Sequence, residues 1–305
     1  MRSTINIVLV TGARGFLGKY VVRRGRDLGF EVHSVSSSGQ PLDSTEWKAD
    51  ICNSSQLLDV LGSVRPDAII HLAARGVEYS SVSPEEILQS NILGTLQLFE
   101  CMERSGLRIP VVVAGSGFEY MPQLRPVSEA DPVVPWSVYG VSKNAAVNVA
   151  RLYASRFPVA VLRIFSVYGS GERPSRLLPY IIACARNGVV VDLTPGLQIR
   201  DYIFAADVAE AFWRTLAITS EPGFQILNVG SGTAVSLRDF AFAVGSQLRR
   251  SGIAVELRFG ARPYRSDELM HYVANNTRMV EKLGWTPPTT LEDGVGRTLE
   301  EMLTC

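Results

Sequence analysis

Residues 11–18 read Thr-Gly-Ala-Arg-Gly-Phe-Leu-Gly, directly after the apolar run Ile5–Val10 and at the start of the amphipathic segment Phe16–Gly29. A strand, a glycine-rich loop and a helix in this order are typical of a dinucleotide-binding site. Glycines permit a tight turn, and they let the backbone approach a pyrophosphate at the helix N-terminus. The residues that we expect to contact a cofactor here are Gly12, Arg14, Gly15, Phe16, Leu17 and Gly18.

The N-terminal half continues this alternation of short β-branched runs with helix-length segments. Short strands that are almost entirely apolar are buried on both faces, as in a parallel sheet built from βαβ units. We therefore predict an α/β fold with a Rossmann-type, doubly wound parallel sheet. The predicted strands are 5–10, 31–36, 68–72, 110–115 and 159–164, and the predicted helices are 16–29, 54–64, 84–106 and one that carries Tyr139 and Lys143.

Beyond Ser166 the alternation is less regular. Helices are predicted at 177–187 and 207–218, and strands at 189–193 and 225–229. We interpret residues 1–165 as a dinucleotide-binding domain and residues 166–305 as a smaller α/β substrate-binding domain that covers the ends of the sheet strands. Residues 200–230 are expected to return to the main sheet.

The composition narrows the classes of function. The 305 residues include 30 basic and 30 acidic side chains without a basic run, which argues against a nucleic-acid surface. Four scattered cysteines, with the three histidines apart from them, predict neither a disulfide framework nor a metal site. The first apolar run is too short for a signal peptide, and no stretch approaches membrane-spanning length. We expect a cytoplasmic protein, without membrane contact, that binds a small nucleotide-like ligand.

Tyr139 and Lys143 are the ends of the pentapeptide Tyr-Gly-Val-Ser-Lys. Residues four apart share one face of a helix, so the two side chains can act as a unit. A phenol with an ordinary pKa of about 10 exchanges protons poorly near neutrality, but a neighbouring ammonium favours the phenolate. The pair can therefore exchange a proton with a substrate hydroxyl or ketone. An exposed helical tyrosine beside a solvated lysine is the structural alternative.

The glycine loop, the segment His-Leu-Ala-Ala at 71–74 and the pentapeptide at 139–143 resemble the extended short-chain dehydrogenase/reductase family, especially its nucleotide-sugar epimerases, dehydratases and reductases. Further motifs follow in that family's order over nearly the whole chain. They are Asn91 in Asn-Ile-Leu-Gly-Thr, Ser116 after a strand, Leu-Arg-Ile-Phe at 162–165 and Arg-Asp-Tyr-Ile at 200–203.

The resemblance implies roles for individual residues. Ser116, Tyr139 and Lys143 match the catalytic positions, where Ser116 would orient a sugar ketone and Lys143 would also hold the nicotinamide ribose. Cofactor contacts are further implied for Asp50, Ile51, Leu72, Ala73 and Ala74. We expect Asn91 to tie the helix of Tyr139 to its neighbour through a buried polar network.

The end of the second strand bears on which nicotinamide cofactor is bound. An acidic residue there would accept hydrogen bonds from the adenosine ribose, but this chain has Ser36, followed by Ser37. Serine hydroxyls can hydrogen-bond a 2′-phosphate instead of repelling it, and Arg14 adds a cation in the glycine loop. NADP(H) is therefore favoured over NAD(H), although serines tolerate NAD as well.

The residues after Ser116 separate reactions within the family. Dehydratases need an acid and a base directly after the catalytic hydroxyl, and this chain has Gly117 and Phe118 there. Glu119 would point elsewhere if the backbone were extended. Dehydration is thus disfavoured, which leaves reduction of a 4-keto-6-deoxyhexose at C4, the favoured reading, or 4-epimerisation with retained NAD. A nucleotide-sensing module without catalysis is the alternative outside enzymes.

Substrate contacts are implied at Ser116, Gly117, Ser166, Arg200 and Arg265. Guanidinium groups suit the oxygens of a nucleoside diphosphate, which is the physical reason to prefer the two arginines. The chain departs from the family pattern at the Ser166 position, usually asparagine, and around Arg265, so the sugar and the base stay open. A nucleotide-diphosphate sugar is the expected partner, and a homodimer through helices 84–105 and 137–155 is expected.

Overall fold

The structure, a computed structural model, describes residues 5–76 and 82–303. Its centre is a seven-stranded parallel sheet in the order β11-β6-β5-β4-β1-β2-β3. The strands are β1 (Ile7–Thr11), β2 (Glu31–Ser36), β3 (Glu46–Lys48), β4 (Ala68–His71), β5 (Val111–Ser116), β6 (Pro158–Ile164) and β11 (Gly223–Val229). The predicted Rossmann-type sheet is confirmed. The order reverses between β1 and β4, where doubly wound sheets leave a crevice for a dinucleotide.

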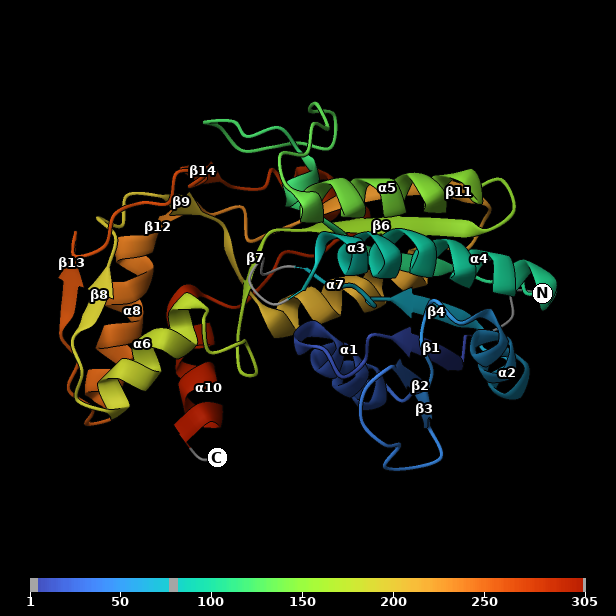
Figure 1. Ribbon diagram of the computed structural model, residues 1–305, viewed down its shortest axis with the longest axis horizontal. Coiled ribbons are helices and arrows are strands. Elements are labelled where there is room, and N and C mark those ends of the chain that lie inside the picture. Colours follow the sequence, from blue (N-terminus) through green and yellow to red (C-terminus); the bar gives the residue numbers. More distant parts are fainter. Residues whose placement is uncertain (1–4, 77–81, 304–305) are drawn as a thin grey trace.

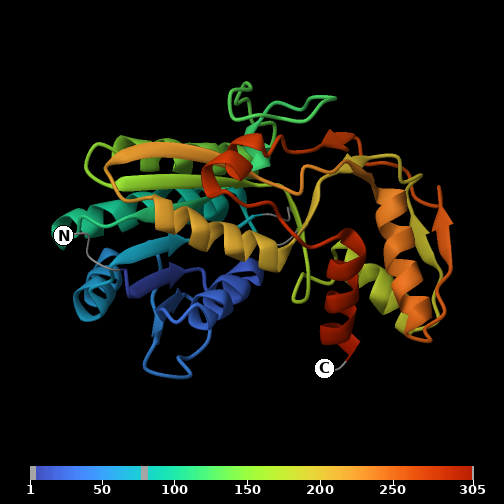
Figure 2. The same ribbon diagram turned by 180° about the vertical axis from the view of Figure 1, so that it is seen from behind.

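Helices cover both faces of this sheet (Figures 1 and 2). One face packs against α1 (Phe16–Asp27), α7 (Ala205–Ile218) and α9 (Thr277–Leu283), and the other against α2 (Ser54–Val64), α4 (Gly94–Arg104) and α5 (Val138–Leu152). Each strand supplies both cores, because alternate side chains point to opposite faces. Val8 and Val10 accordingly face α1 and α7, whereas Leu9 faces α2 and α4.

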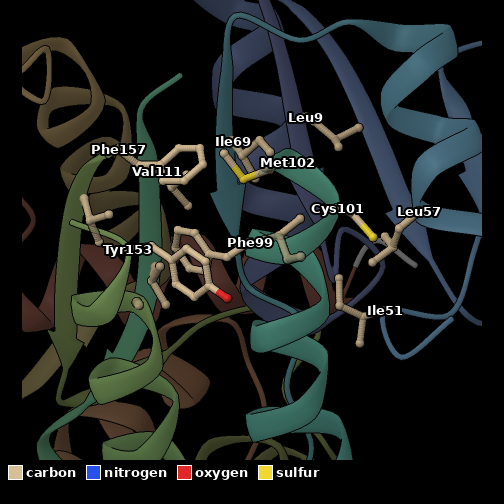
Figure 3. Packing of buried hydrophobic residues seen from close by; sticks show 14 of the residues in the cluster. Leu9, Ile51, Leu57, Ile69, Phe99, Cys101, Met102, Val111, Tyr153 and Phe157 are labelled. Atoms are coloured by element: carbon tan, nitrogen blue, oxygen red, sulfur yellow. The ribbon is translucent and has the colours of Figure 1, made fainter. Parts of the chain in front are cut away.

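Aromatic side chains fill the core beneath α4 and α5 (Figure 3). Phe99 on α4 stacks on Tyr153, with ring centroids 4.9 Å apart, and meets Phe157 edge-on at 5.8 Å. Leu9 and Ile69 approach from the sheet and have no exposed surface. This packing holds the C-terminal end of α5 against the sheet, and α5 is the helix that carries Tyr139 and Lys143.

The helix predicted at 84–106 is divided into three pieces. The first, α3 (Pro84–Leu88), begins with a capping box in which Ser83 and Glu86 satisfy each other's backbone N–H groups. A π-helical turn, η1 (Gln89–Leu93), then precedes α4. Such turns widen the helix locally and are frequent at functional sites. This one contains Asn91, which is buried.

A smaller α/β part follows β6 and lies beside the sheet domain (Figure 1). Its elements are β7 (Ser166–Tyr168), α6 (Leu177–Arg186), β8 (Val191–Leu193), β9 (Ile199–Arg200), β10 (Tyr202–Phe204), β12 (Val235–Ser236), α8 (Leu237–Arg250), β13 (Leu257–Phe259), β14 (His271–Tyr272) and α10 (Leu291–Leu303). It has its own apolar core between α6, α8 and α10. Between these elements, α7 and β11 return to the main sheet, where β11 pairs with β6. Within 5–76 and 82–303, no helix combines the length and apolarity that a membrane span requires.

Candidate active site

The glycine loop closes tightly against the end of β4. Gly12 has a φ of +69°, and a Cβ atom there would lie 2.6 Å from the backbone nitrogen of Ala73. A Cβ at Gly18 would lie 2.3 Å from the Gly12 carbonyl oxygen. Both positions therefore require glycine, one for its backbone angle and both for the close approach. The turn brings Leu72 and Ala73, two predicted cofactor contacts, beside the loop.

The N-terminus of α1 is open to an anion. Gly15 is its N-cap residue and makes no side-chain capping bond, and the first turn holds no acidic side chain. The first N–H groups of a helix have no partners within the helix, and with the helix dipole they favour a phosphate. The cradle of backbone around Gly12 and this uncapped helix end fit the pyrophosphate of a dinucleotide.

His71 links the ends of two strands behind the loop. Its Nδ1 lies 2.7 Å from the Thr11 hydroxyl oxygen, and its Nε2 lies 3.1 Å from that of Thr95. Burial, followed by the nearby charge of Lys143, lowers the pKa of His71 to about 3, so the ring is neutral. His71 is thus a packing residue with both ring nitrogens in hydrogen-bonding contact.

The predicted adenosine end of the site is a small hollow beside β2. Arg14, Ser34, Ser36, Ser38, Gly39, Pro41, Glu46, Trp47 and Lys48 line it. The Arg14 guanidinium donates to the carbonyl oxygens of Ser38 and Gln40 and forms a 2.7 Å ion pair with Glu46. The cation that the sequence offers to a 2′-phosphate is therefore paired with a carboxylate, a partner that the sequence did not indicate.

Four other predicted cofactor residues differ in exposure. Ser37 is exposed after β2, and Asp50 is exposed in the turn before α2, where its carboxylate accepts the N–H of Cys52 at 2.9 Å. Ile51 is buried, and a Cβ at Gly94 would lie 2.6 Å from its Cγ2 atom. Ala74 is exposed beyond β4. Ile51 thus packs in the core, whereas Asp50 and Ala74 are accessible to a ligand.

Helix α5 presents Tyr139 and Lys143 on one face, as the spacing predicts. Ser137 begins the helix by accepting the N–H of Gly140 at 3.0 Å. Tyr139 is half-buried, whereas the Lys143 side chain is almost completely removed from solvent. Burial lowers the pKa of Lys143 to about 8, and the charge of Glu119 opposes this shift.

The π-helical turn joins α5 to its neighbour. The Asn91 amide donates to the Ser142 hydroxyl at 2.8 Å and to the Arg75 carbonyl at 2.9 Å, and its oxygen accepts the Arg75 N–H at 2.7 Å. Ser142 in turn donates to the carbonyl of Tyr139 at 2.7 Å. The predicted polar tie between the two helices is confirmed, and it fixes the first turn of α5.

Ser116 ends β5 and begins the 3-10 turn η2 (Gly117–Glu119). Its hydroxyl accepts the N–H of Phe118 at 3.2 Å, and the Glu119 carboxylate accepts the Ser116 N–H at 2.7 Å. The expectation for Glu119 assumed an extended backbone, which is wrong here. Because the backbone turns, Glu119 folds back beneath Ser116 and pairs with Arg163 on β6, at 2.8 Å.

Tyr272 is a site residue that sequence reasoning missed. It comes from β14 in the smaller part. Its hydroxyl donates to the Ile164 carbonyl oxygen at 3.4 Å and lies close enough to the Ser116 side chain to be affected by it electrostatically. A Cβ at Gly117 would lie 2.5 Å from this hydroxyl oxygen. Burial raises the pKa of Tyr272 well above its usual range. A two-residue strand carries no periodicity, so no sequence signal identifies this tyrosine.

The Phe118 ring connects the two halves of the site. It lies 6.2 Å from the Tyr139 ring in an edge-on arrangement and 5.0 Å from the Tyr272 ring, measured between centroids. The first turn of α5 is close as well, because a Cβ at Gly140 would lie 2.3 Å from the Phe118 carbonyl oxygen. The three predicted catalytic side chains therefore gather at the carboxyl ends of β5 and β6.

The two predicted phosphate-binding arginines share one carboxylate. Arg200 lies 2.7 Å from Glu268, and Arg265 lies 3.5 Å from the same side chain. Arg200 is mostly buried, whereas the Arg265 side chain is 77% exposed. Arg200 pairs with Tyr272 in the β9–β14 register, which links the arginines to the region of Ser116. Ser166 starts β7 just beyond β6, at the same edge of the sheet.

A model of the NAD dependent epimerase/dehydratase family matches residues 8–230. The match runs from β1 to β11 and includes the glycine loop, Ser116, Tyr139 and Lys143. The chain belongs to the NAD dependent epimerase/dehydratase family. As a member of the nucleotide-sugar group of this family it is an enzyme, and the resemblance carried by the sequence motifs is confirmed.

The chain is similar to three relatives over nearly their whole length. The chain is 31% identical over 312 residues to UDP-glucose 4-epimerase of Mycolicibacterium smegmatis, covering 96% of the chain and 97% of that protein. It is 27% identical over 313 residues to CDP-abequose synthase of Salmonella typhimurium, covering 97% and 98%. Among solved structures, MoeE5 in complex with UDP-glucose and NAD is 32% identical, with a TM-score of 0.86 over 98% of this chain and 99% of that one.

Proposed function

We propose that the chain catalyses oxidation or reduction at C4 of the hexose in a nucleotide-diphosphate sugar, with Tyr139 as the proton donor or acceptor. The observation that carries this proposal is the convergence of Ser116, Tyr139 and Lys143 at the sheet edge that also holds the glycine loop. A nicotinamide dinucleotide, when bound, supplies or accepts the hydride. Gly12, Gly15 and Gly18 would hold its pyrophosphate.

The side chains divide the proton chemistry among them. Tyr139 exchanges the proton of the sugar hydroxyl, and the Lys143 ammonium stabilises the phenolate form of Tyr139. The Ser116 hydroxyl orients the reacting oxygen of the sugar. The Phe118 ring, packed beside Tyr139 and Tyr272, helps to exclude water from the reacting atoms.

Dehydration of the sugar is not supported by the surroundings of Ser116. Gly117 carries no acid, and an aspartate there would collide with the Tyr272 hydroxyl. Phe118 carries no base. The nearby carboxylate of Glu119 is fully buried and already bound to the Ser116 N–H and to Arg163. Hydride transfer alone is therefore the chemistry that we assign.

Of the two remaining reactions, 4-epimerisation and net reduction at C4, we propose 4-epimerisation with retained NAD as the first candidate. The sequence argument for NADPH combined the serines after β2 with a cation at Arg14, and Arg14 is ion-paired with Glu46. A carboxylate at that point would repel a 2′-phosphate. The 31% identical relative named UDP-glucose 4-epimerase and the NAD complex of MoeE5 support the same choice.

Net reduction of a 4-keto-6-deoxyhexose with NADPH is the second candidate. Ser36, Ser38 and Lys48 line the hollow beside β2 and offer hydroxyl and ammonium donors to a 2′-phosphate. The similarity to CDP-abequose synthase also supports keeping this candidate, because it shows that relatives of this chain are not all named epimerases.

Two assays on the purified protein distinguish the candidates. Incubation with UDP-glucose, UDP-galactose or UDP-glucuronate without added cofactor should give a mixture of C4 epimers, detected by chromatography. Incubation with NADPH and a nucleotide-linked 4-keto-6-deoxyhexose should give no loss of absorbance at the NADPH band. NADPH consumption without epimer formation would reverse the order of the two candidates, and activity in neither assay would overturn the proposal.

We further propose that Arg200 and Arg265 bind the substrate diphosphate, and that residues 166–305, apart from α7, α9 and β11, form the substrate-binding domain beside a dinucleotide-binding domain of residues 1–165. Glu268 orients both guanidinium groups. Forked guanidinium donors match the paired oxygens of a diphosphate.

A homodimer through α3, α4 and α5 is also proposed. These helices lie together on one face of the sheet (Figure 1). The outer surface of this face exposes Leu93 on η1 and Val141 and Leu152 on α5, at 50%, 46% and 73% of their full area. Exposed leucine and valine on adjacent helices favour association of two copies. Sedimentation velocity of the wild type and of Leu152→Glu would test this, with the variant expected to shift toward monomer.

A further inference from the structure

Glu119 is a completely buried carboxylate directly beneath the reacting centre. One of its oxygens lies 2.7 Å from the Ser116 nitrogen and the other lies 2.8 Å from Nε of Arg163. A Cβ at Gly115 would lie 2.8 Å from the first of these oxygens. Carboxylates are rarely buried unless they are paired, and this one occupies space that a glycine leaves free for it.

Arg163 is tied in place by further contacts. Its side chain is 3% exposed, and its guanidinium carbon lies 4.4 Å from the centre of the Tyr120 ring. The Tyr120 hydroxyl donates to the Asn228 side-chain oxygen at 2.7 Å. Arg163 therefore reaches almost no solvent, and its position fixes the carboxylate of Glu119.

Lys143 is the second buried cation near this carboxylate. The turn η2, which ends at Glu119, packs against α5, and Lys143 and Glu119 are 5% and 0% exposed. Glu119 is the charged group that favours the ammonium form of Lys143, against the effect of burial. A buried ammonium without a balancing charge loses its proton more easily.

The other titratable and charged side chains around Glu119 and Lys143 are His71 from β4, Tyr120 after η2, Tyr139 from α5, Arg163 from β6 and Tyr272 from β14. Burial raises the pKa of Tyr120 to about 12, so this phenol is neutral near neutral pH. The pKa of His71 lies far below neutrality and that of Tyr272 lies well above its usual range, so neither changes charge near neutral pH. Arginine stays charged throughout. Glu119 is thus the balancing group that a substitution can remove selectively.

We propose that Glu119 is a positioning residue for the reaction: its buried carboxylate fixes the backbone that carries Ser116 and balances the charge of the Lys143 ammonium beside Tyr139. Arg163 acts through Glu119 by holding the carboxylate in this place. The catalytic consequence rests on the proposed hydride-transfer function, whereas the effect on Lys143 does not depend on the substrate.

The direct test is the titration of Lys143 in Glu119→Gln. Glutamine keeps the shape of the side chain and an oxygen for the Ser116 N–H, but it removes the charge. The chain has four lysines, Lys19, Lys48, Lys143 and Lys282, so NMR of protein labelled at the lysine side-chain carbons follows each one separately. Substitution of Lys143 by methionine assigns its signal.

We expect the pKa of Lys143 to fall by at least about one unit in Glu119→Gln, because one nearby opposite charge typically shifts a pKa by about 1 to 3 units. The matched control is Glu129→Gln. Glu129 also accepts a backbone N–H, that of Asn228 at 2.7 Å, and it lies beside the same network. The control should leave Lys143 unchanged. An unchanged Lys143 titration in Glu119→Gln, or an equal shift in both variants, would overturn the proposal.

A second variant guards against misfolding, because Glu119→Gln leaves Arg163 without its carboxylate partner. The double variant Glu119→Gln with Arg163→Met removes both members of the ion pair and leaves no unpaired charge between them. The Lys143 pKa should again be lower than in the wild type. A wild-type value in a folded double variant would contradict the assignment.

The pH dependence of kcat then tests the catalytic part of the proposal. In Glu119→Gln the alkaline limb of the kcat profile should move to lower pH by the same amount as the Lys143 titration. A fall of kcat that is equal at every pH would assign Glu119 a purely structural role and overturn the proposal. If the Lys143 titration shifts as expected but no nucleotide sugar is converted by the wild type, the proposed function fails and the electrostatic role of Glu119 stands.

Discussion

Tyr139 and Lys143 stand one helical turn apart but differ in their contact with solvent. Tyr139 is half-buried beside the Phe118 ring, and Lys143 is almost completely buried on α5, which packs against η2. An ammonium that is removed from water acts strongly on a neighbouring phenol, because little solvent screens the charge. The side-chain chemistry of this site is therefore set by burial as much as by residue type.

Replacing Tyr139 by phenylalanine should abolish most of the turnover. The phenolic hydroxyl is the group that is lost, and positioned proton transfer contributes about 10² to 10⁴ in rate. The affinity for the nicotinamide cofactor, measured by fluorescence titration, should stay nearly unchanged because the ring and Lys143 remain. Wild-type activity in Tyr139→Phe would remove Tyr139 from the mechanism.

The wild-type pH profile should have an alkaline limb near pH 8. Burial lowers the pKa of Lys143 from its ordinary value of 10.5 to about 8, so the ammonium is present below this pH and is lost as the pH rises through it. Measurement of kcat between neutral and alkaline pH checks the limb. In Lys143→Met the limb should disappear, and the remaining rate should be low at every pH.

At the level of elements, the turn between β1 and α1 combines two demands on one residue. Gly12 has a left-handed backbone angle, and a Cβ atom at this position would also collide with the backbone of Ala73. At the far end of α1, Gly29 has a φ of +86°, but a Cβ atom added there would have no neighbouring atom within 4 Å. A comparison of the two glycines therefore distinguishes the cost of the left-handed backbone angle, which both have, from the cost of the close approach, which only Gly12 has.

Gly12→Ala should lower the free energy of unfolding more than Gly29→Ala does. The left-handed angle alone costs about 1–2 kcal/mol for alanine, and Gly12→Ala adds a collision with the backbone of Ala73. Chemical denaturation of both variants measures the difference. Cofactor affinity should fall in Gly12→Ala and stay at the wild-type level in Gly29→Ala; equal losses of stability would show that the close approach has little cost.

At the level of the whole molecule, two parts of the chain meet over Ser116. The sheet domain brings the glycine loop, Ser116 and α5, and the smaller part brings Tyr272 and Arg200 through β14 and β9. If the proposed function holds, the cofactor contacts the sheet part, and the sugar nucleotide contacts both the sheet part and the smaller part. We therefore expect that a substitution in the smaller part can weaken binding of the sugar nucleotide without weakening binding of the cofactor.

Arg200→Met should raise KM for the nucleotide sugar roughly 10- to 100-fold, since a hydrogen bond to a charged group contributes about 1.5–3 kcal/mol. The affinity for NAD, measured by calorimetry, should not change. Arg258→Met is the control, because Arg258 pairs with Asp192 on the exposed edge of the smaller part. A parallel loss of NAD and sugar-nucleotide binding in Arg200→Met would place this arginine outside the substrate site.

Local sequence rules account for the scaffold of this protein. Glycine spacing, alternating apolar runs and the i, i+4 pair predicted β1, α1, β2, α2 and β4, the parallel sheet and the face shared by Tyr139 and Lys143. The three-residue strand β3 was not predicted, because so short a segment carries no periodicity. Helix 84–106 was predicted as a single element, because no local signal marks the π-helical turn that Asn91 occupies. Its hydrogen-bond partner Ser142 lies 51 residues away along the chain.

The surroundings of these residues depend on contacts between distant parts of the chain. Tyr272 reaches Ser116 from a strand more than 150 residues later, Arg163 binds Glu119 across 44 residues, and Glu46 pairs with Arg14 across 32. Such contacts depend on how strands and turns are placed relative to one another, which periodicity does not specify. Charge and burial at the site therefore follow from long-range packing, whereas its scaffold follows from the local sequence.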